Sequence, residues 1–305
     1  MKRWIVFILL LILVVMAIFY LLIPSRLSFK NSVTVLATQP AVSRHLGNPM
    51  QWSAWWPGDT PFTYDDQQYT IHPLTLDATN VVITHNNDSL SGIIKLYPLS
   101  TDTISVQWEF AKQTSADPIQ RVKDYFFVKH TRKQMNEIME SMKEFMGSPR
   151  NLYGFEVEQT TVTDTLLVAI KTWIDHYPNT NDVYKLVERL RNYIRNEGAE
   201  EVNQPMLNIL QIDSTHYQYM VAIPVNKVLP GEGEIQMKRM IPGNILVTEI
   251  RGGEASIDAA FHSFDNLVKD YKRKSPAIPF QLLITNRQEV RDTSKWITKL
   301  YYPVI

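Results

Sequence analysis

The sequence of 305 residues contains no cysteine. This absence excludes disulfide bonds, thiolate metal sites, a cysteine nucleophile and lipid attachment through a cysteine. A chain without thiols suits an oxidising compartment, although the absence alone does not assign one.

An excess of charge of either sign is also absent. The chain has 31 Lys+Arg and 31 Asp+Glu, so its formal net charge is zero. Proteins that bind nucleic acid in general show a basic excess or a basic stripe. The one strongly basic run, "KDYKRKS" at 269–275, fits the end of a helix, where basic side chains complement the helix dipole. We therefore expect no nucleic-acid partner.

Short motifs for catalysis or metal binding are missing as well. None of the seven histidines occurs in a His-x-x-x-His, His-Glu-x-x-His or His-x-His pattern. The chain has no Gly-x-Ser-x-Gly, no phosphate-binding glycine loop and no dinucleotide fingerprint. The pair Asp65–Asp66 is interpreted as a solvated loop. We expect no catalytic constellation, no metal site and no cofactor.

The first 25 residues contain a long apolar run. Residues 4–23, "WIVFILLLILVVMAIFYLLI", number 20, and a helix of that length spans a hydrocarbon core of about 30 Å. Bulky residues and Pro24 occupy the place where a signal peptide would be cleaved. The run predicts a single-pass membrane anchor at 1–25. The positive charges before it, from Lys2, Arg3 and the terminal amine, slightly outweigh those of Arg26 and Lys30 after it, so we expect the remaining domains outside the cytoplasm.

The section 26–150 reads as strands followed by one long helix. Four alternating or turn-bounded apolar segments lie between 69 and 113, and Asn86–Asn87 is good turn material. Asp117 and Pro118 begin a helix that Gly147 ends. Its apolar residues keep helical spacing and are interpreted as core (Ile119, Val122, Phe126, Met135, Ile138, Met139, Met142, Phe145). A long helix on an antiparallel sheet is an α+β domain.

The section 151–305 contains an internal duplication. "LLVAIKTWID" from 166 matches "ILVTEIRGGE" from 245, and "YMVAIPV" from 219 matches "TKLYYPV" from 298. Both pairs are 79 positions apart, and each half carries one helix between its matched ends. The pattern predicts a strand–helix–strand–strand module that occurs twice.

This last section resembles the GyrI-like family, the effector-binding domains of bacterial multidrug-responsive transcription activators. The resemblance rests on "GNILVTEIRGGE" and on the ending "DTSKWITKLYYPVI". It implies two pseudo-symmetric modules with a ligand groove between them. In relatives, carboxylates in this groove attract cationic drugs or assist hydrolysis.

Departures from the family pattern fall on those carboxylates. In "PFQLL", Gln281 stands where relatives carry a glutamate, and Lys299 replaces another. An amide neither neutralises a cation nor acts as a base. Glu249 and Glu254 are the candidate substitutes, with exposure to solvent as the alternative for both. The departures argue against cation binding and against catalysis.

The section 26–150 resembles the START/polyketide-cyclase (SRPBCC) helix-grip superfamily. The residues that carry this likeness are "LSFKNSVTVLATQPAVSRHLGNPMQWSAWWP", with Trp52 and Trp55 in a Trp-x-x-Trp segment. The resemblance implies a cavity between sheet and helix that holds an apolar ligand. Trp52 and Trp55 are predicted to pack at the cavity rim, with pocket lining as the alternative.

These features favour a membrane-tethered, non-enzymatic protein that binds a small amphipathic molecule or a lipid. A GyrI-like hydrolase of reactive small molecules and a protein-interaction module are the alternatives. The hydrolase requires Glu249 or Glu254 to point into the groove beside an aromatic hydroxyl. The candidate ligand-binding residues are Trp52, Trp55, Tyr219, Glu249, Gln281, Lys299 and Tyr301.

Overall fold

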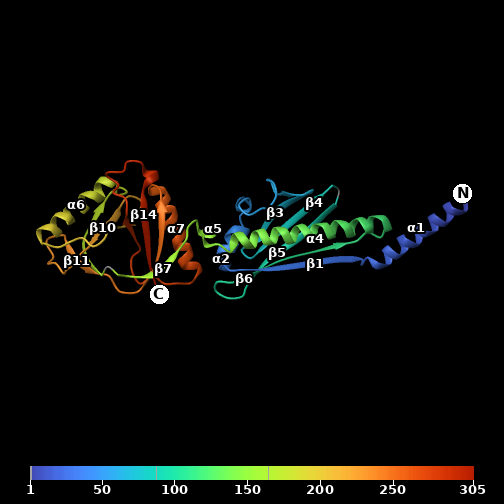
Figure 1. The fold of residues 1–305 in the computed structure, drawn as a ribbon, viewed down its shortest axis with the longest axis horizontal. Coiled ribbons are helices and arrows are strands. Elements are labelled where there is room, and N and C mark those ends of the chain that lie inside the picture. Colours follow the sequence, from blue (N-terminus) through green and yellow to red (C-terminus); the bar gives the residue numbers. More distant parts are fainter. Residues whose placement is uncertain (1, 87, 164) are drawn as a thin grey trace. The chain divides into compact units, whose positions relative to one another are not determined.

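The structure is a computed structural model that describes residues 2–86, 88–163 and 165–305 (Figure 1). The chain divides into two compact units, Met1–Ser148 and Pro149–Ile305. Each unit has one antiparallel sheet with helices packed against it. The predicted α+β class is therefore confirmed.

The sheet of the first unit has one buried face. Its strands are β1 (Arg26–Val35), β2 (Thr63–Tyr64), β3 (Gln67–Thr75), β4 (Ala78–His85), β5 (Asp88–Pro98) and β6 (Ile104–Gln113). Their order is β1-β6-β5-β4-β3-β2. Strands β2 to β6 form a meander, and β1 pairs with β6 at the edge of the sheet. Along β4 and β6 every second residue is buried over most of the strand. Alternate side chains therefore form the core and the others face away from it.

Helix α4 (Pro118–Met146) covers the core of this unit. The side chain of Asp117 accepts a hydrogen bond from the backbone N–H of Gln120 at 2.8 Å, and Pro118 stands in the first turn. The predicted apolar stripe is wrong at its start, where Ile119 and Phe126 are exposed. The later part is core as predicted, with these residues buried: Met135, Ile138, Met139 and Met142.

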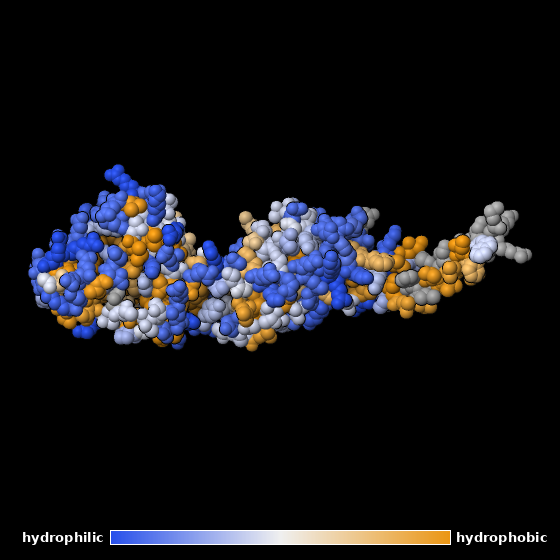
Figure 2. Space-filling view, viewed as in Figure 1, coloured by the Kyte–Doolittle hydropathy of each residue, from blue (hydrophilic) through white to orange (hydrophobic). Residues whose placement is uncertain are grey.

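The apolar N-terminal segment forms helix α1 (Lys2–Leu22). Over the described part of the chain, no helix meets the length and apolar character that a membrane crossing requires, so the predicted anchor and single-pass location are not supported. Ten side chains of this helix, eight of them in the predicted span 4–23, lie outside the described residues. Described residues of α1 are exposed, among them Trp4, Phe7, Leu10 and Leu21. Figure 2 shows hydrophobic surface along this helix.

The second unit repeats one element order. Its elements are α5 (Pro149–Tyr153), β7 (Glu158–Thr161), β8 (Leu166–Ile174), α6 (Thr180–Asn196), β9 (Met206–Gln211), β10 (Tyr217–Pro224), β11 (Gln236–Arg239), β12 (Asn244–Arg251), α7 (Glu254–Asp270), β13 (Phe280–Leu283) and β14 (Ile297–Val304). Strand–helix–strand–strand occurs as β8-α6-β9-β10 and again as β12-α7-β13-β14, in agreement with the repeat in the sequence.

The two modules of this unit form one continuous sheet. Its strand order is β11-β8-β10-β9-β13-β14-β12-β7, and β9 pairs with β13 at the centre. The apolar face of α6 packs on one side of the sheet, against residues such as Val168, Ile170 and Val221. Residues that alternate with these, including Leu167, Ala169 and Ala222, form a second cluster on the opposite side. Both faces of the central strands are therefore buried.

Candidate functional site

The groove between the two modules is nearly closed. It is bounded by the N-terminal ends of α6 and α7 and by the central strands. Its free volume is about 10 Å³, which is about the space that one water molecule occupies. Gln281 lies in this groove as predicted and is only 4% exposed. The residues that line it include Tyr177, Asn179, Tyr184, Ile209, Glu254, Ile257 and Arg287.

A buried arginine fills the groove. The Arg287 guanidinium donates from Nη2 to Gln281 Oε1 at 3.1 Å and to Thr298 Oγ1 at 3.0 Å, and lies 4.8 Å from the Trp296 ring centre. Burial lowers the pKa of Arg287 below its ordinary value. Over the described residues no carboxylate lies within ion-pair distance of it. The protein's own cation thus occupies the place where the family resemblance implies a cationic ligand.

Sequence reasoning did not find Arg287. A single arginine in the loop "TNRQEV" is ordinarily solvated, and nothing in its neighbours predicts burial. The nearest signal in the sequence for a buried cation is Gln281, since an amide in place of a carboxylate removes one negative charge from the groove.

The two glutamates proposed as substitutes lie in different places. Glu249 is exposed on β12 and pairs with Arg251, whose Nη2 is 3.2 Å from Glu249 Oε1. Glu254 begins α7, where it is exposed to solvent and also lines the groove together with Tyr177. Desolvation, opposed by the charge of Arg287, raises the pKa of Glu254 above its ordinary value. Glu254 therefore combines a groove position with a raised pKa, whereas Glu249 lies outside the groove lining.

The remaining candidates of the second unit do not gather at one site. Tyr219 is a core residue beneath α6. Tyr301 stacks on Phe280 with ring centres 5.0 Å apart. Lys299 pairs in register with Glu249, and both line an open polar hollow of about 730 Å³ beside α7. The set predicted as one groove is thus divided among the groove, the hollow and the core.

An apolar pocket of about 360 Å³ opens in the second unit on the sheet face opposite to α6. Its base consists of side chains from the central strands and from the segment after β11 (Met206, Met220, Ala222, Met240, Phe280). Asn208, Lys238, Arg239 and Asn244 add polar groups to its lining. Such a balance of apolar walls and few polar groups is typical of small-molecule sites.

The sequence contained a signal for this pocket that we did not use. The segment "LLVAI" of β8 is apolar at every position, not only at alternate ones, and four of its five residues are buried. A strand that is apolar on both sides predicts that both faces of its sheet are covered. The second face is the one that carries the pocket.

Trp52 and Trp55 belong to the core of the first unit. Trp52 is fully buried, and its Nε1 donates to the Leu46 carbonyl at 3.1 Å. Trp55 is 4% exposed, and its ring centre lies 4.6 Å from that of Trp52. Trp56, Tyr69 and Trp108 continue this aromatic cluster. The resemblance implies a ligand cavity between the sheet and α4. Around these aromatic residues, packed side chains fill that space.

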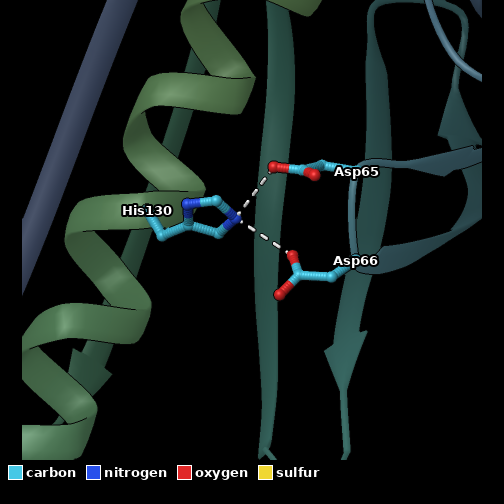
Figure 3. A group of neighbouring side chains, drawn as sticks. All are labelled: Asp65, Asp66 and His130. Carbon is cyan, nitrogen blue, oxygen red and sulfur yellow. Dashed lines mark hydrogen bonds and ion pairs between the residues drawn. The ribbon is translucent and has the colours of Figure 1, made fainter.

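One group of side chains in the described residues has the donor set of a metal site. It consists of Asp65, Asp66 and His130, whose ligating atoms lie within 4.8 Å of one another (Figure 3). The sequence patterns for metal sites missed it because the three residues come from a turn and from a distant helix.

No protein-family model matches this chain, and no curated protein matches it. Among solved structures it is similar to the C-terminal domain of EcmrR, with 13% identity and a TM-score of 0.43 over 50% of this chain and 98% of that chain. It is similar to SAV2435 bound to tetraphenylphosphonium, with 15% identity and a TM-score of 0.33 over 49% of this chain and 94% of that chain.

A third similar structure is the ZhuI aromatase/cyclase from Streptomyces sp. R1128. It has 12% identity and a TM-score of 0.29 over 39% of this chain and 93% of that chain. Since these three TM-scores are below 0.5, the ligand has to be argued from the residues of this chain.

Proposed function

We propose that this protein binds a small apolar or amphipathic molecule, such as a lipid, without transforming it, in the apolar pocket of the second unit. The observation that carries the proposal is the pocket's volume of about 360 Å³ with its lining of methionine, alanine, proline and phenylalanine. Ligand pockets of proteins usually measure about 300–1,000 Å³ and have mostly apolar walls. Flexible methionines such as Met206, Met220 and Met240 adapt to ligands of different shape.

Polar residues in the lining favour an amphipathic ligand. Lys238 and Arg239 lie on edge strand β11, and Asn208 and Asn244 lie on two other strands. The Asn208 side chain is already bonded to the Pro279 carbonyl at 2.9 Å, so it helps to shape the wall. Lys238 pairs in register with Leu167 on the pocket face of the sheet, so its cation is suited to an anionic or strongly polar head group, while the apolar base takes a hydrocarbon tail.

The groove of Gln281 and Arg287 supports a non-catalytic function for that region. About 10 Å³ leaves no space for a substrate beside the guanidinium. Binding there of a lipophilic cation would place two positive charges together in a region of low dielectric constant, which is unfavourable.

We further propose that α1 tethers the protein to a membrane. Support comes from the sequence, in which residues 4–23 form an unbroken apolar run of 20. A test is sodium carbonate extraction of membranes from cells that express the full chain. The tether predicts that the protein stays in the membrane pellet, and its release into the supernatant contradicts the tether without affecting the pocket.

Native mass spectrometry of the full chain, purified in mild detergent, tests the binding function. We expect a bound apolar or amphipathic molecule that dissociates at higher collision energy. Absence of a bound molecule, together with no thermal stabilisation by any member of an amphipathic-compound library, contradicts the proposal.

A second candidate function is hydrolysis of reactive small molecules, which requires the groove to open for the substrate, and Glu254 is the observation that favours it. Its raised pKa and its place beside Tyr177 are features of a general acid or base. The test is turnover of activated esters and epoxides by wild type and by Glu254→Gln. A rate that falls at least tenfold in the variant supports hydrolysis, and equal rates contradict it.

A further inference from the structure

We propose that Asp65, Asp66 and His130 form a binding site for a divalent transition-metal ion such as Zn²⁺ in the first unit. The two aspartates form the tip of the hairpin between β2 and β3, in which Tyr64 pairs with Gln67. His130 lies on α4, far away in the sequence (Figure 3). An ion held by all three would therefore connect the hairpin to the helix.

The distances from His130 Nε2 to the two carboxylates fit a shared ion. His130 Nε2 is 3.0 Å from Asp66 Oδ1 and 3.4 Å from Asp65 Oδ2. Zn²⁺ holds nitrogen and oxygen ligands at about 2.1 Å. Two ligands at that distance from one ion are separated by about 3.0 Å at a right angle and by about 3.4 Å at the tetrahedral angle. The observed separations correspond to these two values.

The donor set also fits the charge of the ion. Two carboxylates and one neutral imidazole balance a charge of two, and they offer the oxygen and nitrogen ligands that suit Zn²⁺ and Mn²⁺. Asp65 and Asp66 remain about half or more exposed, with side-chain exposures of 65% and 52%. Water and ions therefore have access to the open coordination positions.

A buried network holds the imidazole in place. Gln134, one turn further along α4, is only 2% exposed. Its Oε1 accepts from the Tyr69 hydroxyl at 2.9 Å, and its Nε2 donates to the Tyr64 carbonyl at 3.3 Å. The same Nε2 lies 3.0 Å from His130 Nε2. Gln134 thus packs against the imidazole and helps to fix its orientation.

His130 Nε2 faces a carboxylate oxygen of Asp65 and one of Asp66. An ion bound by these three atoms would take the place of a proton between the imidazole and the carboxylates, and Gln134 would keep its bond to the Tyr64 carbonyl.

Asp66 has a further support that metal ligands commonly have. His85, the last residue of β4, places its Nδ1 at 2.8 Å from the Asp66 carbonyl oxygen and at 3.3 Å from Asp66 Oδ2. The second carboxylate oxygen and the backbone of Asp66 are thus oriented by one ring, which leaves Oδ1 for the ion. His85 acts here as a positioning residue.

Isothermal titration of Zn²⁺ into the full chain tests this site, with a purification tag that contains no histidine and with prior removal of metal by chelation. We expect one saturable site, at least tenfold weaker in His130→Gln and in Asp66→Asn. The control is His216→Gln, which removes the histidine of an exposed pair with Asp213 at 2.9 Å. This control should bind Zn²⁺ as wild type does.

A spectroscopic readout separates ligation from a loss of folding. Co²⁺ at the site should give visible absorption in wild type and in His216→Gln, and the band should be lost in His130→Gln although circular dichroism shows a folded chain. No saturable Zn²⁺ binding in wild type, or equal affinity in wild type and His130→Gln, overturns the proposal and assigns the cluster to a proton-mediated contact.

Discussion

Arg287 donates a hydrogen bond to Gln281 in the groove between the two modules, with 3.1 Å between Nη2 and Oε1. Both side chains are buried, at 8% and 4% exposure. The guanidinium has no carboxylate within ion-pair distance in the described chain, and its hydrogen bonds go to neutral acceptors. Gln281 is therefore the neutral counterpart of a resident cation, and its amide is needed for stability.

Replacement of Gln281 by leucine should destabilise the second unit. The change leaves a buried guanidinium with one acceptor fewer, and a hydrogen bond to a charged group contributes about 1.5–3 kcal/mol. Chemical denaturation should show a free energy of unfolding lower by that amount. Gln211→Leu makes the same exchange at an exposed position and serves as control. Equal effects of the two variants would contradict the importance of this bond.

Replacement of Trp52 by alanine should destabilise the first unit by about 3–5 kcal/mol, because the indole is fully buried among other aromatic rings. Thermal unfolding followed by near-ultraviolet circular dichroism measures the loss. Met50→Ala, at a residue 84% exposed, should have little effect. A Trp52→Ala protein that keeps its melting temperature but loses a ligand would show that the tryptophans line a pocket after all.

The turn between β9 and β10 should respond to acid. Backbone N–H groups of Thr215 and His216 bond to the Asp213 carboxylate and lower its pKa from 3.8 to about 2. A depressed pKa in the folded state means that Asp213 adds stability above pH 4, which is lost as the pH falls towards 2. A carbon-13 NMR titration of the Asp213 carboxyl group should give a midpoint near 2, and a midpoint near 3.8 would contradict the role of the turn.

Much of the fold followed from the sequence because its signals are local and periodic. Asp117 and Pro118 marked the start of α4, and a constant spacing of 79 residues marked the repeat of the second unit. These features depend on neighbours in the chain or on a comparison of two segments. They needed no knowledge of which side chains meet across a sheet.

The sites did not follow, since they depend on contacts between distant segments. Tyr219 was predicted to line the groove, but its side chain lies in the core beneath α6. Arg287 looked like a solvated loop residue, yet its loop folds back over Gln281. Asp65 and Asp66 were interpreted as a solvated loop because nothing in the sequence placed His130 beside them. The sequence pattern alone does not show which distant side chains come together.

The central claim is that the apolar pocket of the second unit binds a ligand. Ala277 lines this pocket at an exposed position, and Ala255 is exposed on α7 outside its lining. A tryptophan at Ala277 should block the pocket without disturbing the core, whereas Ala255→Trp adds the same ring elsewhere. Fluorescence titration with N-phenyl-1-naphthylamine compares the two variants with wild type.

We predict that wild type and Ala255→Trp bind the probe with the same affinity and that Ala277→Trp binds it at least tenfold more weakly. Equal affinity in all three proteins would place the probe elsewhere, and no binding in wild type would leave the pocket without a ligand of this kind. Either of these two results contradicts the claim.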